Sequence, residues 1–278
     1  MLPTPVLELT LNSKTASDCN SRYAALSGSA SASAVFVWVR CRHIKSRKSK
    51  LEMRLNKLPQ PVTSKTTEHS SPQLYRPQHS RFTAAIARNP IHHAVFLDRD
   101  GTVVEDVGYL TDPSQLKLLP GSVEGIKLLQ DQFFIVMVTN QSAVARGLLD
   151  EKGLLSIHQE LATALHSHGA LLDAIYACPH YPTSDSAPYR VQCNCRKPQP
   201  GMLLKARDDF DIQLGSSLMI GDKASDIVAG QQAGVAATVL IASHKADSGL
   251  PLNATPTYVT SNLYEAAQLI LDHCARDS

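Results

Sequence analysis

Short apolar runs that alternate with amphipathic stretches constrain the fold of this chain more than any other feature. Apolar strands are expected at 94–97 (AVFL), 133–138 (FFIVMV), 174–177, 217–220 (SLMI), 235–241 and 258–260. Helices are expected at 121–131, 148–168, 200–210 and 224–233, and a last helix begins after Asn262 with Glu265 as its capping-box partner. Continuous apolar strands separated by helices predict an α/β fold: a Rossmann-like parallel sheet with helices on both faces.

The first 92 residues differ from the remainder in charge. They contain 14 Lys and Arg against 4 Asp and Glu, whereas residues 93–278 contain 13 against 21. The segment 1–92 also shows no sustained period, so we expect a largely disordered basic extension before a folded domain at 93–278. An organelle import peptide is one interpretation of such an extension, and a dispensable segment or an upstream start is the plainer one. The acidic domain argues against nucleic-acid binding.

Hydropathy and cysteine placement indicate the compartment. The longest apolar run near the N-terminus, 34–39, is far too short to span a membrane, so no membrane partner is expected. Three of the six cysteines, Cys178, Cys193 and Cys195, lie close together, which favours metal binding over disulfides in a reducing environment. We therefore expect a cytoplasmic protein, and we expect a monomer.

Polar residues follow the first two strands of the predicted sheet. Asp98 and Asp100 leave the first strand in the string DRDGT, and two carboxylates this close repel each other unless a cation binds beside them. The second strand ends in the segment 139–142 (TNQS), where the free N–H groups of a helical turn would suit an anion. Ligands of parallel α/β sheets bind at this edge. Taken singly, each segment would also fit an ordinary polar turn or helix cap.

Two further charged segments follow later in the chain. Arg196 and Lys197 are adjacent cations, and Asp222 and Asp226 flank Lys223 in the string GDKASD after the fourth strand. A solvated cation pair and an N-cap with an exposed acid are the simpler interpretations of these segments in isolation.

In combination, these segments resemble the haloacid dehalogenase superfamily of phosphatases, which has an acid pair, a hydroxyl, a lysine and a second acid pair in this order. The strings DRDGT, TNQSAVARG, C-x-H…C-x-C-R-K-P and GDKASD are similar to those of the D-glycero-D-manno-heptose 1,7-bisphosphate 7-phosphatase family, whose nearest relative is histidinol-phosphate phosphatase. The resemblance extends over about 93–241 and does not include the first 92 residues.

The resemblance implies a role for each matching residue. Asp98 would be the nucleophile and Asp100 the general acid and base, while Thr139 and Lys197 would bind the phosphoryl oxygens. Mg²⁺ would be held by Asp98, by Asp222 and by the backbone carbonyl of Asp100. Asp226 would orient Lys223 or a metal-bound water. The residues that would contact the substrate are Asp106, Val107, Gly108, Tyr109, Asn140, Gln141, Ser142, Arg196 and Lys223. No long insertion follows the first two motifs, so a large cap domain is not expected.

A cysteine and histidine cluster predicts a second metal. Cys178 and His180 form one close pair, Cys193 and Cys195 form another, and 12 residues separate the pairs. Three sulfurs and an imidazole suit a closed tetrahedral Zn²⁺ site, which would be structural because it leaves no open position for water. A surface loop with free thiols is the alternative interpretation.

These patterns predict a Mg²⁺-dependent phosphatase that acts on a small phosphorylated metabolite through an aspartyl-phosphate. The leading substrate is D-glycero-D-manno-heptose 1,7-bisphosphate, hydrolysed at the C7 phosphate during nucleotide-heptose synthesis for bacterial lipopolysaccharide. Alternatives are a histidinol-phosphate phosphatase or another small-metabolite phosphatase, a nucleic-acid 3′-phosphatase, and a non-catalytic zinc-stabilised binding module.

Overall fold

The computed structural model describes residues 71–80, 93–242 and 254–276. One seven-stranded sheet runs through this part of the chain in the order β1-β4-β3-β2-β5-β6-β7, and every strand pair except β1–β4 is parallel. The strands are β1 (Gln73–Tyr75), β2 (Ala94–Leu97), β3 (Phe134–Asn140), β4 (Ala174–Cys178), β5 (Leu218–Gly221), β6 (Ala237–Ile241) and β7 (Tyr258–Thr260). The expected α/β architecture is confirmed.

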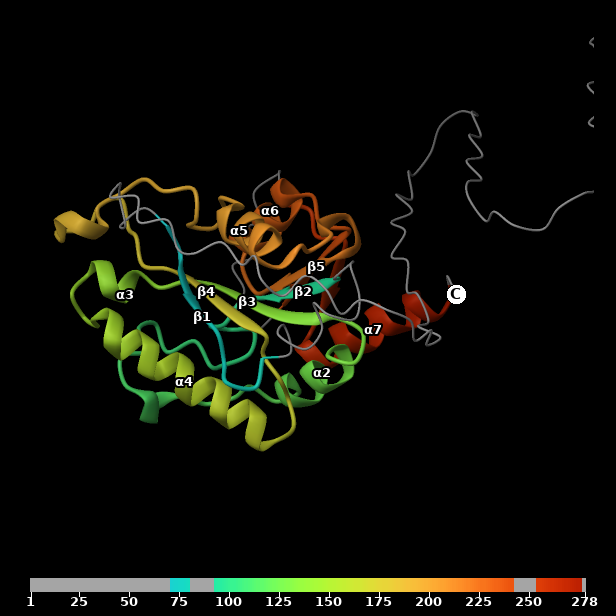
Figure 1. Cartoon of the computed structure of the whole chain (residues 1–278). Coiled ribbons are helices and arrows are strands. Elements are labelled where there is room, and N and C mark those ends of the chain that lie inside the picture. Colours follow the sequence, from blue (N-terminus) through green and yellow to red (C-terminus); the bar gives the residue numbers. More distant parts are fainter. Residues whose placement is uncertain (1–70, 81–92, 243–253, 277–278) are drawn as a thin grey trace, which may run out of the picture. The chain divides into compact units, whose positions relative to one another are not determined.

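Helices cover both faces of the sheet (Figure 1). They are α2 (Ser122–Leu129), α3 (Ser142–Ala145), α4 (Glu151–Ser167), α5 (Gly201–Phe210), α6 (Ala224–Ala233) and α7 (Leu263–Arg276), with short 3-10 turns η2 (Pro113–Gln115), η3 (Ala187–Tyr189) and η4 (Leu214–Ser216). The central strand β2 shows how the core forms, because its alternate side chains enter two different clusters. Val95 and Leu97 pack with α2, α4 and α7, whereas Ala94 and Phe96 pack with α5 and α6.

The position of β2 defines the functional edge of the sheet. It pairs with β3 on one side and with β5 on the other, and the chain runs outward in opposite directions from these two neighbours. In open α/β sheets a crevice forms at the carboxyl ends of the strands where the order reverses. The residue at that point is Asp98.

Helix boundaries differ slightly from those expected. The chain after β3 forms the separate short helix α3, and α4 begins only at Glu151 because the Asp150 side chain accepts a hydrogen bond from the N–H of Gly153 at 2.7 Å. Pro200 is the N-cap of α5 rather than part of its first turn. The cap of α7 is as expected, since Asn262 Oδ1 accepts from the N–H of Glu265 at 2.9 Å.

One strand comes from the segment that was expected to be disordered. β1 pairs antiparallel with β4, with Leu74 opposite Tyr176. The expectation was wrong for these residues, because the outer edge of β4 offers unpaired backbone groups that a short segment can satisfy without any sequence period of its own. Of the first 92 residues, the structure describes only 71–80, so the prediction for 1–70 and 81–92 lies outside the described residues.

The segments that follow the first two parallel strands contain few helices and no inserted domain. Between β2 and β3 lie only η2 and α2, and after β3 the chain passes directly into α3 and α4. No separate cap domain is therefore present in the part of the chain that the structure describes, as expected. Among the helices of the same residues, none combines the length and the apolar character needed to cross a membrane.

Candidate active site

Asp98 lies at the carboxyl end of β2 in a buried ion-pair network. Its backbone N–H donates to the carbonyl of Ile220 at 3.0 Å, and its side chain is almost fully buried. Lys197 Nζ lies 2.6 Å from Asp98 Oδ1, 2.6 Å from Asp226 Oδ1 and 2.7 Å from the carbonyl oxygen of Val138. The lysine therefore fixes the predicted nucleophile through a direct ion pair.

The charges of this network affect one another. Burial raises the pKa of Asp98, and Lys197 opposes this rise. Burial alone would lower the pKa of Lys197, but the carboxylates of Asp226 and Asp98 outweigh it and raise that pKa. Lys197 is thus kept as a cation in a site that contains more acids than bases.

Asp98, Asp222 and Asp226 form a cluster whose carboxylate oxygens lie within 4.8 Å of one another. Asp222 Oδ1 is buried and makes no hydrogen bond within the described residues, and the pKa of Asp222 is raised to about 7, first by burial and then by the charge of Asp98. A divalent cation would satisfy both features, since hard cations prefer carboxylate oxygens. The residues present therefore fit Mg²⁺.

Gly101 allows Asp222 to approach the first motif. Its φ is +88°, and a Cβ built on it would lie 2.2 Å from Asp222 Oδ2. Any side chain at this position would displace the Asp222 carboxylate, because non-bonded carbon and oxygen atoms do not come so close. The glycine of the DRDGT string is thus required by the geometry of the cluster.

Asp100 is held by two buried side chains that the sequence did not identify as a group. Arg99 Nε and Nη2 donate to Asp100 at 2.9 and 3.0 Å, and Gln141 Nε2 donates to Asp100 Oδ2 at 2.8 Å. Arg99 Nη2 also donates to Gln141 Oε1 at 2.9 Å. Gln141, for which a substrate contact is predicted, is buried and forms hydrogen bonds with Arg99, Asp100 and Thr139.

Asn140, for which a substrate contact is also predicted, binds the backbone of Lys197. Its Nδ2 donates to the carbonyl of Lys197 at 3.0 Å, and its Oδ1 accepts from the backbone N–H of Lys197 at 3.0 Å. Both ends of the amide are therefore used to hold the Lys197 backbone, while Thr139 and Ser142 stand on either side of the same turn. The lysine and hydroxyl motifs are joined at this point.

The expected substrate loop 106–109 is anchored to the cluster. Lys223 Nζ lies 3.0 Å from Asp106 Oδ2, and the N–H of Gly108 donates to Asp106 Oδ1 at 2.9 Å. Although burial would raise the pKa of Asp106, these hydrogen bonds lower it. Val107 and Tyr109 remain exposed beside this anchor.

Asp226, which is predicted to orient Lys223 or a metal-bound water, contacts two lysines. Its carboxylate accepts from the backbone N–H of Lys223 at 3.0 Å and also pairs with the side chain of Lys197 at 2.6 Å, a contact that was not predicted. Gly221 allows this approach, because a Cβ there would lie 2.4 Å from the Asp226 side chain. The string GDKASD contained the signal, since a second acid stood one turn along the helix.

The cysteine and histidine residues converge as predicted. The four ligand atoms of Cys178, His180, Cys193 and Cys195 lie within 4.8 Å of one another, and five of the six pairs are separated by 3.2–3.6 Å. A tetrahedral Zn²⁺ with bonds of about 2.3 Å would separate its sulfurs by about 3.8 Å, so the cluster matches that shape in a slightly compact form. Hydrogen bonds from Cys178 and Cys195 lower the pKa of Cys193, which favours the thiolate that binds metals.

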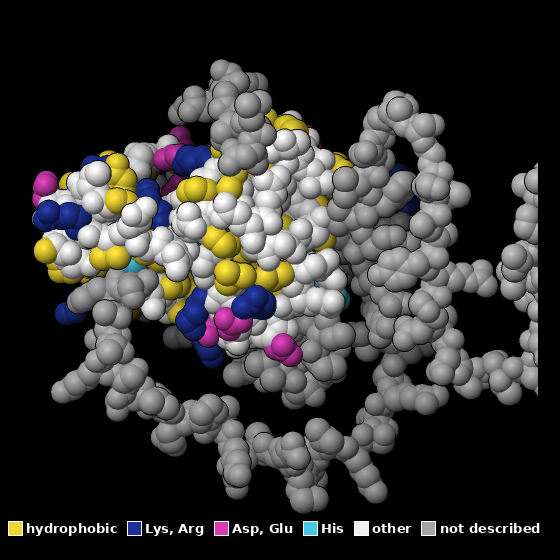
Figure 2. Space-filling view, turned by 90° about the horizontal axis from the view of Figure 1, so that it is seen from above, with side chains coloured by type: hydrophobic (Ala, Val, Ile, Leu, Met, Phe, Trp, Pro, Cys, Tyr) yellow, Lys and Arg dark blue, Asp and Glu magenta, His cyan; other side chains and the backbone are white. Residues whose placement is uncertain are grey.

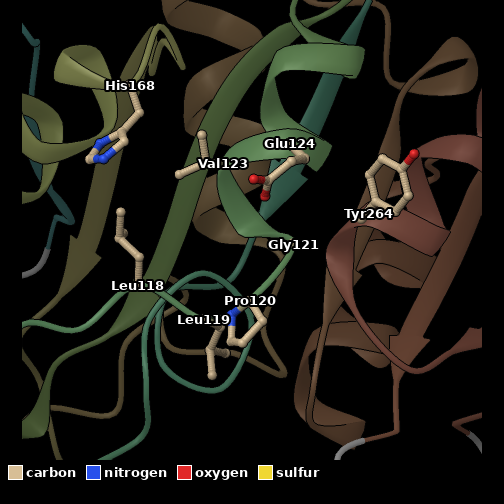
Figure 3. A pocket seen from close by; sticks show the side chains of 8 residues that line it. All are labelled: Leu118, Leu119, Pro120, Gly121, Val123, Glu124, His168 and Tyr264. Atoms are coloured by element: carbon tan, nitrogen blue, oxygen red, sulfur yellow. The ribbon is translucent and has the colours of Figure 1, made fainter.

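Arg196 is positioned by the same loop. Its Nη1 donates to the carbonyl of His180 at 3.1 Å. Because Arg196 and Lys197 directly follow the ligand Cys195, the cluster fixes both cations of the predicted substrate site. A separate surface pocket lies elsewhere, lined by Leu118, Leu119, Pro120, Gly121, Val123, Glu124, His168 and Tyr264 (Figure 3). It contains none of the predicted site residues, which gather instead around Asp98.

Comparisons with known proteins agree with this geometry. A family model described as HAD-hydrolase-like matches residues 194–266. The D-glycero-β-D-manno-heptose-1,7-bisphosphate 7-phosphatase of Photorhabdus laumondii is 39% identical over 183 residues, which cover 66% of this chain and 91% of that protein. The enzyme of the same name from Vibrio cholerae is 40% identical over 153 residues, covering 55% and 82% respectively.

A solved structure is also similar. The crystal structure of D,D-heptose 1,7-bisphosphate phosphatase from B. bronchiseptica, complexed with magnesium and phosphate, matches with a TM-score of 0.56 and 35% sequence identity. The match covers 65% of this chain and 99% of that chain. The similarity therefore includes almost the whole of the solved chain.

Proposed function

Since this chain belongs to the D-glycero-β-D-manno-heptose-1,7-bisphosphate 7-phosphatase family of haloacid dehalogenase-like hydrolases, we propose that it hydrolyses the C7 phosphate of that sugar bisphosphate. The observation that carries the proposal is the convergence of Asp98, Asp222 and Lys197 at the carboxyl end of the central strand. A nucleophile, a cation site and a phosphate-binding lysine are the groups that phosphoryl transfer requires.

The reaction begins with attack of an Asp98 carboxylate oxygen on phosphorus, in line with the leaving sugar oxygen. Asp100 protonates that oxygen as it departs, which leaves a phosphoryl group covalently bound to Asp98. Asp100 then accepts a proton from the water that hydrolyses this aspartyl-phosphate, which contributes about 10² to 10⁴-fold to the rate. Arg99 and Gln141 keep Asp100 in place for both proton transfers.

Charge on the transferring group is neutralised by Lys197 and by the hydroxyl of Thr139, because an anionic nucleophile otherwise repels an anionic phosphate. Asp98, Asp222 and the backbone carbonyl of Asp100 would hold the Mg²⁺ ion. When bound, the metal supplies further positive charge at the phosphoryl oxygens. Asp226 acts through Lys197, since it holds the ammonium group beside Asp98.

We propose that the cluster of Cys178, His180, Cys193 and Cys195 binds Zn²⁺ and has a structural role. All four ligands come from the protein, so the cluster offers no open position for chemistry. Cysteines that would bind a metal rather than form disulfides also support a reducing compartment such as the cytoplasm.

The remaining expectations of the sequence extend this proposal. A place in nucleotide-heptose synthesis for lipopolysaccharide would follow from the substrate. A monomeric state stays a prediction, and so does a substrate contact of Asp106, Val107, Gly108, Tyr109, Asn140, Gln141, Ser142, Arg196 and Lys223.

Steady-state kinetics test the proposal directly. We expect kcat/KM for the β-anomer of the heptose bisphosphate to exceed that for histidinol phosphate by at least about 100-fold, with dependence on Mg²⁺. Release of phosphate from histidinol phosphate at a comparable kcat/KM would instead favour the alternative substrate. Hydrolysis of 3′-phosphorylated DNA serves as the control for the nucleic-acid alternative.

A further inference from the structure

Arg99 of the DRDGT string is a buried cation with one unpaired corner. Lys, Arg, Asp and Glu side chains lie at the surface on the face of the molecule drawn in Figure 2, whereas Arg99 is only 1% exposed. Its Nε and Nη2 donate to Asp100, and Nη2 also donates to Gln141. Nη1 is buried and has no hydrogen-bond partner among the described residues. A buried donor of a charged group without an acceptor is costly.

The buried imidazole of His158 has the complementary defect. His158 belongs to α4 and is 3% exposed, and its Nε2 makes no hydrogen bond in the part of the chain that the structure describes. The ring of Tyr75 in β1 lies beside it, with centroids 6.3 Å apart. Burial and, after it, the charge of Arg99 lower the pKa of His158 to about 3, so the imidazole is neutral at physiological pH. A neutral imidazole with its proton on Nδ1 offers an acceptor at Nε2.

The alternation of the central strands places Arg99 on the face of the sheet that α4 covers. Val95 and Leu97 of β2 belong to the core cluster on that face, and side chains two residues apart along a strand share a face. Arg99 continues this row just beyond the end of β2. Gln141 continues the row of Met137 in β3 in the same way, and the hydrogen bond between Arg99 and Gln141 agrees with this placement.

Helix α4 carries His158 to the same level of the sheet. Figure 1 shows α4 on one side of the sheet, with α5 and α6 on the other. Leu154, near the start of α4, packs with Ala177, close to the carboxyl end of β4, whereas Leu161 belongs to the apolar cluster beneath β2. His158 lies between these two leucines on the buried side of the helix. It therefore lies between the strand ends and the apolar core, at the depth of Arg99.

We propose that His158 is a positioning residue for the general acid and base Asp100, because its Nε2 accepts from Arg99 Nη1 through one buried water. Buried waters commonly join polar groups that have no other partner. This contact holds the guanidinium in the orientation that binds Asp100, so His158 acts only through Arg99. The inference rests on the proposed function, since it takes Asp100 to protonate the leaving oxygen. An apolar side chain at position 158 would leave Nη1 without an acceptor and free the guanidinium to turn away from Asp100.

Two substrates separate proton donation from folding and binding. A sugar alkoxide needs a proton as it leaves, whereas p-nitrophenolate is a weak base and leaves p-nitrophenyl phosphate without one. The ratio of kcat/KM for the sugar phosphate to kcat/KM for the aryl phosphate therefore measures donation by Asp100. Both values come from one protein sample, so a loss of folded enzyme lowers them equally and leaves the ratio unchanged.

For His158→Leu we expect kcat/KM for the heptose bisphosphate to fall about 10- to 30-fold, a part of the about 10² to 10⁴-fold that general acid–base catalysis contributes. The value for p-nitrophenyl phosphate should change less than about threefold, because this leaving group needs no proton. His158→Gln should stay within about threefold of wild type on both substrates, since its side-chain oxygen can replace Nε2 as the acceptor. His158→Met, whose flexible side chain fits irregular gaps, gives the same test if the leucine variant does not fold. His166→Leu, exposed on the same helix, is the matched control and should leave both values unchanged.

Arg99→Lys shows whether His158 acts through Arg99. Lysine has no Nη1, so in this background His158→Leu should lower the ratio by less than about twofold more. A high-resolution crystal structure should show the water bound to both Arg99 and His158. The proposal would be overturned, with the proposed function intact, by a full further loss in the Arg99→Lys background. An equal fall on both substrates in His158→Leu, no fall at all, a glutamine variant as impaired as the leucine variant, or a crystal structure without that water would each do the same.

Failure of the proposed function is visible separately. Asp100→Asn should lower kcat/KM for the heptose bisphosphate far more than for p-nitrophenyl phosphate, and equal losses would remove the acid role of Asp100 itself. If the wild-type protein does not hydrolyse the heptose bisphosphate, any alkyl phosphate that it does hydrolyse replaces that substrate. The ratio depends on the basicity of the leaving oxygen and not on the sugar, so the test of His158 keeps its meaning.

Discussion

The two ligand clusters of this molecule use opposite chemistry at neighbouring strand ends. Asp98, Asp222 and Asp226 follow β2 and β5 and offer carboxylate oxygens as ligands. Lys197 pairs with two of these carboxylates, and Asp222 Oδ1 has no hydrogen-bond partner among the described residues. The three cysteines and His180 around the end of β4 instead contact one another, and together they could hold a metal ion with four protein ligands. The difference teaches that a cluster with an unpaired carboxylate oxygen leaves a place for a cation and a substrate. A cluster whose four ligands all come from the protein can instead hold the loop that carries Arg196 and Lys197.

Replacing the nucleophile should separate the two clusters most clearly. Asp98→Asn removes the attacking oxygen anion, and we expect kcat to fall by about 10⁴-fold or more. Zinc content should be unchanged, because the cysteine ligands do not contact Asp98. Phosphate release and metal analysis on the same sample measure both quantities. Activity within tenfold of wild type would contradict the nucleophile assignment.

Removing one sulfur should have the converse effect. In Cys193→Ser we expect bound zinc to be lost and the free energy of unfolding to fall by about 3 kcal/mol or more, since the metal's binding energy contributes to folding. Activity should fall about 10- to 100-fold through misplacement of Arg196 and Lys197. Metal analysis, thermal unfolding and kcat/KM are the measurements, with Cys274→Ser as the matched control for loss of a buried thiol outside the cluster. Full stability without zinc would show that the cluster has no structural role.

Gly101 offers a finer test on the oxygen cluster alone. In Gly101→Ala the new methyl group would displace Asp222, and we expect kcat/KM to fall about 100-fold because small displacements of reacting groups are costly. Part of any loss comes from backbone strain at positive φ. Gly234→Ala controls for it, because Gly234 has φ +80° with open space around the added atom. Equal activity of the two variants would remove the steric argument.

The smallest predicted effect is a pH dependence of stability that arises from the buried His158 of α4. Burial, aided by the charge of Arg99, lowers its pKa to about 3 from 6.5. The folded state therefore binds fewer protons than the unfolded state between these values. Stability should fall by about 1.4 kcal/mol per pH unit as pH decreases below 6.5.

His158→Gln should flatten this slope, and chemical denaturation at several pH values measures it. The exposed His166 on the same helix provides the control variant, His166→Gln, which should keep the wild-type slope. A wild-type slope in His158→Gln would assign the acid sensitivity to other groups.

The sequence predicted most of the sheet and the ends of its central strands. Buried strands such as β2 and β3 appear as continuous apolar runs, and the acids that follow them are next to those runs in the chain. The partners of Asn140 were not predictable, because its amide pairs with a backbone 57 residues away. The role of Arg99 was missed for a different reason, since a single basic residue within a motif carries no periodic signal, even though its partner Asp100 is its neighbour in the chain.

The antiparallel strand β1 has a practical consequence for anyone who shortens this chain to the region shared with its relatives. A version that starts at residue 93 would strip the outer flank of β4 of its hydrogen-bonding neighbour and uncover the backbone of Ile175, Tyr176 and Ala177. Such a fragment is expected to self-associate through the exposed edge of β4. Aggregation of the fragment would then result from the loss of β1 and not from instability of the catalytic domain.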